Sequence, residues 1–334
     1  GVVLRAIFLD AATTMDSLPA RREPLNSGGS RILCRNSLQM IGNVLLRDNP
    51  LVLVDVGASG GLDPRWDRIT TEYRAILFEP DPREFQRLKN QSAPNLVVLQ
   101  AALADVPRSL DLHLCVKQEL SSLFVPNFEY LKKFRKVERF DIAKTLRLQA
   151  DTLCNQLKLN GISDIDFMKL DTQGSELMIL KGSDEYLHAA VGIEVEVEFS
   201  AVYTGQPLFG EVDAFAREKG LELFDIRKRF WRRDGCPKRN VSPGQLVFAD
   251  ALYLRAPENL LGAGQVPEDK IIRAFCVYLA YERDDLARLL MNEATSGGML
   301  SAANQTLTAS VLARFRKRRF LGRFIGSYKV DRSF

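Results

Sequence analysis

The residues of this chain whose types and spacing could do chemistry are acidic, and each stands at the end of a short apolar run. Asp55 follows the apolar run at 51–54 and precedes a turn of small residues at 57–61. Glu79 ends a second apolar run, and Asp171 ends a third. Runs this short, with apolar residues on both faces, are typical of central strands in a parallel sheet. Because open α/β sheets bind ligands at the carboxyl ends of their strands, we expect a nucleotide site where these strands end.

The turn after Asp55 is built from residues that let the backbone approach a ligand closely. The dinucleotide fingerprint Gly-x-Gly-x-x-Gly would place glycine at positions 59 and 62. This chain has Ser59 and Leu62 there, so the match is poor. Glu79 follows the turn by about twenty residues. This spacing suits a carboxylate that binds ribose hydroxyls, whether the cofactor is a dinucleotide or another nucleotide. An NAD-dependent oxidoreductase therefore stays as the alternative.

The elements that must position these residues alternate between strand and helix. The glycine turn leads into Asp63-Pro64, which suits the start of a helix. Two strands in succession at 221–226 and 245–254 indicate an antiparallel hairpin, and 110–116 indicates an extra strand. The segment 126–145 is charged and irregular, and we expect a flap there. The pattern predicts strands at 51–56, 75–79, 96–100, 165–171 and 191–199, and helices at 37–47, 63–73, 82–90, 151–160, 177–181 and 208–219.

Five segments together resemble the FkbM family of methyltransferases. They are VDVGASGG (54–61), LFEPDP (77–82), MKLDTQGSELMILKG (168–182), IEVEVEF (193–199) and YTGQPLF (203–209). The resemblance covers about residues 50–255, and Gln173 stands where the family more commonly has Glu. It implies a Rossmann-like class I methyltransferase fold, with a mostly parallel sheet and an antiparallel terminal hairpin. It also implies methyl transfer from S-adenosylmethionine, typically to a hydroxyl oxygen of a sugar, glycan or natural product.

By matching position, the resemblance also implies which residues hold the cofactor and which face the acceptor. Glu79 would bind the ribose hydroxyls, and Ala101 and Ala102 would flank the adenine. Asp171 and Glu176 would stand near the acceptor. The turn residues that would line the methionine and ribose side of the cofactor are Asp55, Gly57, Ala58, Ser59 and Gly60.

Methyl transfer to a hydroxyl needs a base that takes the proton as the new bond forms. Both His113 and His188 lie outside any strong motif, so a carboxylate is the better candidate. Asp171 has the best position, and Glu176 is expected to orient the substrate or the loop. Glu196 is the reserve base. It alternates with Glu194 and Glu198 on one strand, where at least one carboxylate should face a ligand unless the whole face is a solvated edge.

The composition of the chain limits which kinds of protein it can be. The chain has 334 residues, 46% of them hydrophobic, with a formal net charge of +4, which is too small to imply nucleic acid. Five scattered cysteines favour a reducing, cytoplasmic compartment and argue against a structural metal site. We expect an N-terminal arm and helix at 1–49, a methyltransferase domain at 50–256 and a helical C-terminal appendage at 257–334, which could form an oligomer contact.

A basic stretch at 227–239 carries seven positive charges around Phe230 and Trp231. It could meet an anionic acceptor, or it could be a solvated hairpin. A third class of function, a methyltransferase-like binding protein without catalysis, is disfavoured because Asp55, Glu79 and Asp171 are all present.

Overall fold

The computed structural model describes residues 38–91, 93–235, 242–262 and 264–320, with side chains as far as residue 314. Residues 1–37 of the expected N-terminal arm and helix, and Lys238 and Arg239 of the basic stretch, lie outside the described residues. The first expected helix is found at 38–46. None of the described helices has the length and apolar character required to cross a bilayer.

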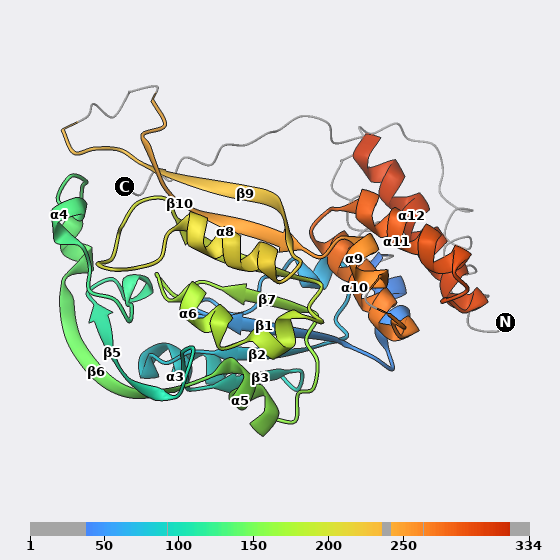
Figure 1. Cartoon of the computed structure of the whole chain (residues 1–334), viewed down its shortest axis with the longest axis horizontal. Coiled ribbons are helices and arrows are strands. Elements are labelled where there is room, and N and C mark those ends of the chain that lie inside the picture. The colour runs from blue at the N-terminus through green and yellow to red at the C-terminus, as the bar shows by residue number, and fades with distance from the viewer. Residues whose placement is uncertain (1–37, 92, 236–241, 263, 321–334) are drawn as a thin grey trace, which may run out of the picture. The chain divides into compact units, whose positions relative to one another are not determined.

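Seven strands form the main sheet, in the order β3-β2-β1-β7-β8-β10-β9 (Figure 1). The five strands from β3 to β8 are parallel, and β10 is antiparallel to both β8 and β9. The expected Rossmann-like sheet with an antiparallel terminal hairpin is therefore confirmed. The strands are β1 (Leu51–Val56), β2 (Tyr73–Phe78), β3 (Leu96–Leu99), β7 (Phe167–Leu170), β8 (Gly192–Glu198), β9 (Glu222–Trp231) and β10 (Gln245–Leu254).

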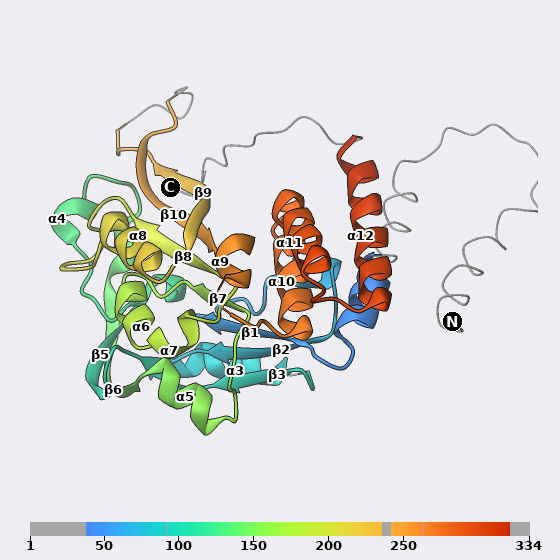
Figure 2. The same cartoon turned by 45° about the vertical axis from the view of Figure 1, so that its right-hand side comes forward.

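Helices cover both faces of this sheet, which explains why its central strands are apolar on both sides. Val54 faces a core built with α5 (Leu153–Leu159), α6 (Glu176–Lys181), α7 (Asp184–Leu187) and α8 (Phe209–Glu218). Leu53 faces the opposite core. The helices of that second core are the one at 38–46, α3 (Pro82–Asn90), α9 (Pro257–Leu261), α10 (Glu268–Ala280), α11 (Asp284–Ser296) and α12 (Ala302–Phe320) (Figure 2).

The helix expected at 63–73 was a wrong prediction. Only a single 3₁₀ turn forms there, η1 (Trp66–Arg68), and β2 begins at Tyr73. The β-branched run Ile69-Thr70-Thr71 is a poor helix former. Trp66 is instead buried against Phe167 and Tyr281, the latter from the end of α10. The contact between Trp66 and Tyr281 thus joins this segment to the C-terminal helices.

Buried ion pairs hold α10 against the sheet. Lys270 and Arg273 reach Asp166, just before β7, at 2.9 Å each. Both also reach Asp164, at 3.0 and 2.9 Å. The division of the chain at residue 257 stays a proposal, but residues on its two sides share one apolar core.

A second sheet of three strands, in the order β4-β6-β5, stands beside the carboxyl ends of the main strands. The extra strand expected at 110–116 is β5. The segment expected to be an irregular flap is folded: it packs Leu131, Phe134 and Phe140 into a small core with Trp231. The second sheet and the short helices between its strands comprise β4 (Ala102–Leu103), β5 (Arg108–Cys115), η2 (Gln118–Leu120), α4 (Phe128–Leu131), η3 (Val137–Phe140) and β6 (Ile142–Asp151).

Candidate active site

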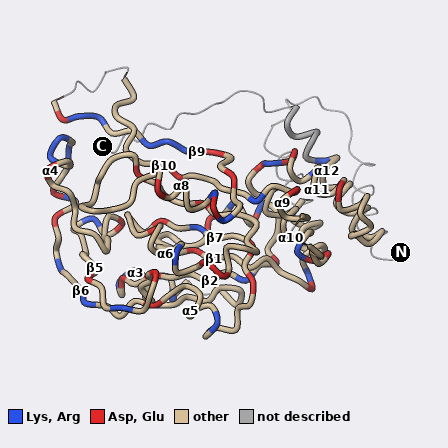
Figure 3. The backbone as a smooth tube through the Cα atoms, viewed as in Figure 1, with Lys and Arg blue, Asp and Glu red and all other residues tan. Residues whose placement is uncertain are grey.

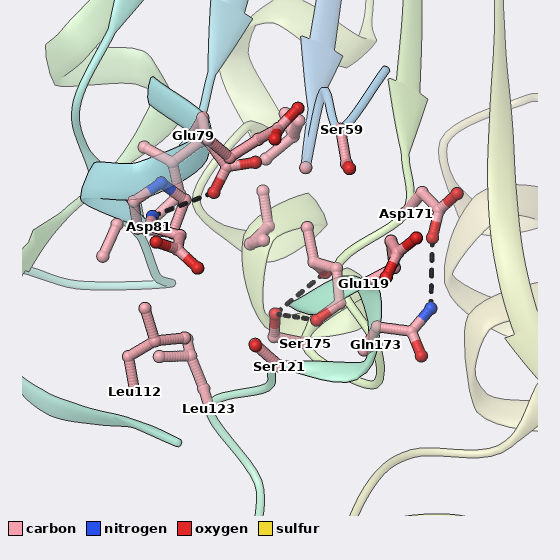
Figure 4. Close-up of a pocket in the computed structure, with 18 of the residues that line it drawn as sticks. Ser59, Glu79, Asp81, Leu112, Glu119, Ser121, Leu123, Asp171, Gln173 and Ser175 are labelled. Atoms are coloured by element: carbon pink, nitrogen blue, oxygen red, sulfur yellow. Dashed lines mark hydrogen bonds between the residues drawn. The ribbon is translucent and has the colours of Figure 1, made fainter. Parts of the chain in front are cut away.

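A pocket opens where β1, β2 and β7 end, and we call it the strand-end pocket (Figure 4). The space within it is about 680 Å³ when the open solvent at its mouth is included. The segment 112–123, which contains η2, closes its far side. The main-sheet residues that line it include Gly57, Ser59, Glu79, Asp81, Asp171, Thr172, Gln173 and Ser175, together with Ala101 and Ala102 after β3.

Gly57 lets two of these strand ends meet. Its φ is +75°, a conformation that favours glycine. A Cβ at this position would lie 2.0 Å from the main-chain oxygen of Asp171. The glycine turn and the end of β7 can therefore approach each other only because position 57 has no side chain.

Glu79 is a buried acid of the strand-end pocket, as are Asp81 and Glu84. Its side chain is 6% exposed and accepts a hydrogen bond from the Asp81 main-chain N–H at 2.9 Å. Burial raises the pKa of Glu79 to about 7, although that hydrogen bond opposes the rise. A ligand that donates two hydroxyls, as a ribose does, would compensate a carboxylate in this position.

The predicted cofactor residues divide into two groups. Gly57, Ser59, Glu79, Ala101 and Ala102 line the strand-end pocket. Asp55, Ala58 and Gly60 do not line it.

Each residue of the second group has a different environment. Ala58 is buried in the core shared with the C-terminal helices. Gly60 donates its N–H to Glu84 at 3.2 Å. Asp55 is on the sheet face that the C-terminal helices cover: its Oδ1 lacks a hydrogen-bond partner among the described residues and lies 4.0 Å from the Lys169 Nζ. Burial raises the pKa of Asp55 to about 6, and Lys169 moderates the rise.

Sequence reasoning missed the residues that close the pocket from α3 and from the inserted segment. Glu84 accepts hydrogen bonds from Gly60 and from Gln118 Nε2, at 3.2 Å each. Gln118, Glu119 and Ser121 line the pocket from η2 and its end. A charged residue in the first turn of α3 was visible in the sequence. Its contact with a segment more than thirty residues away was not.

The charges of the strand-end pocket discriminate between cofactors. Five carboxyl side chains line it, those of Glu79, Asp81, Glu84, Glu119 and Asp171. Among the described residues, no Lys, Arg or His lines it. S-adenosylmethionine carries a sulfonium and an ammonium against one carboxylate, so this lining fits it. The pyrophosphate of NAD would meet like charge here, which is unfavourable.

A second cavity adjoins the first, and we call it the aromatic cavity. Glu119, Asp171 and Gln173 line both spaces, so they stand at the junction. The aromatic cavity encloses about 670 Å³ including its mouth. Its remaining lining residues are Lys117, Leu120, Phe140, Glu196, Glu198, Val202, Tyr203, Trp231 and Phe248.

Gln173 connects the acidic groups at the junction. Its Nε2 donates to Asp171 at 3.2 Å and to Glu196 at 2.5 Å, and its Oε1 accepts from the Tyr203 hydroxyl at 3.0 Å. Its φ of +58° is rarely adopted by residues other than glycine. The amide separates two carboxyl groups that a glutamate at this position would crowd.

Glu176, one of the predicted catalytic residues, lines neither cavity. Its carboxyl group accepts from Thr172 N at 2.6 Å, from Thr172 Oγ1 at 2.9 Å and from Gly174 N at 2.9 Å. Burial raises the pKa of Glu176 to about 7, against those hydrogen bonds. The residue therefore holds the loop between Asp171 and the start of α6.

The three glutamates of β8 are all buried, so the solvated-edge interpretation of this strand is wrong. Glu194 pairs with Arg65 at 2.8 Å and with Arg227 at 2.5 Å. Glu196 and Glu198 line the aromatic cavity. The described residues contain no group of three or more acidic, His or Cys side chains arranged to hold a metal ion.

Comparison with known proteins finds similar methyltransferases. A 2-O-methyltransferase NoeI from Sinorhizobium fredii (strain NBRC 101917 / NGR234) is 27% identical over 180 residues, covering 50% of this chain and 71% of that protein. Magnesium protoporphyrin IX methyltransferase (ChlM) from Synechocystis PCC 6803, solved with bound SAM, is 7% identical with a TM-score of 0.29, covering 71% of this chain and 87% of that one. M. jannaschii TYW2 in complex with AdoMet is 13% identical with a TM-score of 0.29, covering 70% and 79%.

The model of the methyltransferase FkbM domain matches residues 55–223, half of the chain. That range contains the glycine turn, Glu79, the Asp171–Glu176 loop and β8. The chain belongs to the FkbM family of S-adenosylmethionine-dependent methyltransferases.

Proposed function

We propose that this chain methylates a hydroxyl oxygen of a small-molecule or glycan acceptor, with Asp171 as the general base. The observation that carries the proposal is that Asp171 lines both the strand-end pocket and the aromatic cavity. A base must reach the acceptor hydroxyl while the acceptor oxygen faces the methyl donor. Because the strand-end pocket fits the cofactor, the aromatic cavity is the proposed acceptor site.

When bound, S-adenosylmethionine supplies a methyl group that is already activated on a sulfonium. The chain's own residues then have to align the acceptor oxygen, exclude water and take the hydroxyl proton. Asp171 takes that proton in this proposal. Gln173 donates to Asp171 and so holds its carboxylate in position. Glu196, bonded to the same amide, stays the reserve base.

The name of the relative, a 2-O-methyltransferase, supports transfer to oxygen. Phe140, Tyr203, Trp231 and Phe248 line the aromatic cavity and could pack against the apolar face of a sugar ring. Cytoplasmic location and oligomer formation through the C-terminal helices stay expectations from the sequence.

Replacing Asp171 with Asn tests the proposal. The variant should bind S-adenosylmethionine within about tenfold of the original, yet lose roughly 10²-fold or more in kcat, the range of general-base losses. Glu196→Gln should lose less. Turnover is followed as S-adenosylhomocysteine, with labelled cofactor and fractionated glycans, lipids and metabolites.

Three results would count against it. An Asp171→Asn variant that turns over normally would remove Asp171 as the base. Tighter calorimetric binding of NAD than of S-adenosylmethionine would favour the oxidoreductase. Cofactor binding with no labelled product in any fraction would favour a binding protein without catalysis.

A further inference from the structure

The charge of the aromatic cavity points to the kind of acceptor it takes. Four acidic side chains line it, Glu119, Asp171, Glu196 and Glu198, against one basic residue among those described, Lys117. We propose that the acceptor carries a protonated amine close to its reacting hydroxyl, as an amino sugar does. This inference rests on the proposed methyl transfer to a hydroxyl in the aromatic cavity.

The two buried glutamates of the aromatic cavity, Glu196 and Glu198, give the strongest support for a cationic acceptor. Glu196 and Glu198 are only 8% and 4% exposed and lie two residues apart on one face of β8. Burial raises the pKa of both well above the usual range for glutamate, and neighbouring carboxyl groups raise them further. The described residues around them include other acids, Asp171, Glu176 and Asp250, that act on them in the same direction. A ligand cation beside them would stabilise their charged forms and so be favoured here, whereas a carboxylate or phosphate would oppose those charged forms.

The aromatic lining suits the same ligand. Trp231 lies between Phe140 and Phe248, with ring centroids 6.1 Å from each and ring planes inclined at 60° and 76°. An ammonium group is attracted to an aromatic face within about 6 Å, most strongly to that of tryptophan. The cavity thus combines the two features that bind a desolvated ammonium, aromatic rings and acidic side chains.

Three arginines of the basic stretch that suggested an anionic acceptor are engaged elsewhere. Lys and Arg gather along β9 and beside α4 (Figure 3). Arg227 pairs with Glu194 at 2.5 Å, and Arg229 pairs with Asp250 at 3.3 Å. Arg233 lies over the Phe134 ring at 5.1 Å. None of the basic residues described in this stretch lines the aromatic cavity.

Three sugars of one ring size and different charge test the inference: glucosamine, glucose and glucuronate. Each is titrated into the protein saturated with S-adenosylhomocysteine. Binding is followed by calorimetry on the full chain, and by Trp231 fluorescence in a Trp66→Phe variant, since the chain has only two tryptophans. Calorimetry on the unmodified chain keeps the test valid if the Trp66 variant folds poorly. Glucosamine should bind at least about tenfold more tightly than glucose, and glucuronate more weakly than either.

Variants then identify the acid responsible. Glu198→Gln keeps the shape of the side chain and removes its ability to carry a negative charge beside a bound cation. It should weaken glucosamine binding about tenfold and leave glucose within about twofold. Glu218→Gln, on the exposed surface of α8, is the matched control and should change neither.

The outcomes separate this inference from the proposed function. Glucose binding as tightly as glucosamine, glucuronate binding more tightly, or no binding of any of the three at their highest soluble concentrations would overturn the amine. Methyl transfer to an acidic or uncharged acceptor would overturn the amine and leave the methyltransferase intact. A protein that binds the amine but forms no S-adenosylhomocysteine with any acceptor would instead refute the proposed function.

Discussion

Asp166 anchors the C-terminal helices to the catalytic sheet, and replacing it should reveal how much they contribute to stability. Its side chain is completely buried. It accepts hydrogen bonds from Val52 N, Lys270 Nζ and Arg273 Nε, each at 2.9 Å. Asp166→Asn keeps the size and one acceptor oxygen but removes the negative charge that faces two cations.

The magnitude follows from what remains after the substitution. Removing one partner of a buried ion pair costs about 3–5 kcal/mol, because the other charge is left buried and unpaired. Asp164 still contacts both Lys270 and Arg273, at 3.0 and 2.9 Å, and is partly exposed. We therefore expect a loss near the lower end, about 3 kcal/mol, and, for a chain of this length, a fall in Tm of roughly 4 °C.

Urea unfolding of the original chain, Asp166→Asn, Lys270→Met and the double variant measures this effect and its coupling. The double variant should be less destabilised than the sum of the single variants, because each single change leaves a charge without its partner. Lys158→Met is the control and should change the free energy of unfolding little, since both side chains of the Lys158–Glu185 ion pair are exposed. A loss below about 1 kcal/mol for Asp166→Asn would show that apolar packing alone holds these helices.

Three further predictions concern the cofactor side of the site. Glu79→Ala should weaken S-adenosylmethionine binding by about 1.5–3 kcal/mol, as for a hydrogen bond to a charged group, and an unchanged calorimetric Kd would remove the ribose assignment. Burial raises the pKa of Asp55 from 3.8 to about 6 and that of Glu79 from 4.5 to about 7, so the folded chain holds more protons than the unfolded chain between those limits. Both groups should therefore lower the free energy of unfolding of the cofactor-free protein as pH rises from about 4 to about 7; urea titrations across this range check the sign, and a steady rise would refute it. Gly57→Ala should abolish cofactor binding, because its Cβ would meet a main-chain oxygen at 2.0 Å. Gly60→Ala has open space around it and should cost only about 1–2 kcal/mol of folding stability, for its φ of +95°. Equal shifts in Tm on adding S-adenosylmethionine to the two variants would contradict the close approach at Gly57.

The sequence by itself determined the sheet and much of the cofactor side. Alternating core contacts such as those of Leu53 and Val54 follow from a strand with apolar residues on both faces. The positions of Gly57 and Glu79 followed from where apolar runs end. These features are local in the chain, and the order of strands in a parallel sheet then brings their ends together.

Only the tertiary structure decided the rest. The helix expected at 63–73 was lost because Trp66 packs against residues of β7 and α10. Glu119 joins the site because an inserted segment closes over the strand ends. Glu194 is neutralised while Glu196 faces the aromatic cavity, although both lie on one face of the same strand. In each case a contact between residues far apart in the chain sets the outcome, and no local pattern of polar and apolar residues specifies which distant partner will be there.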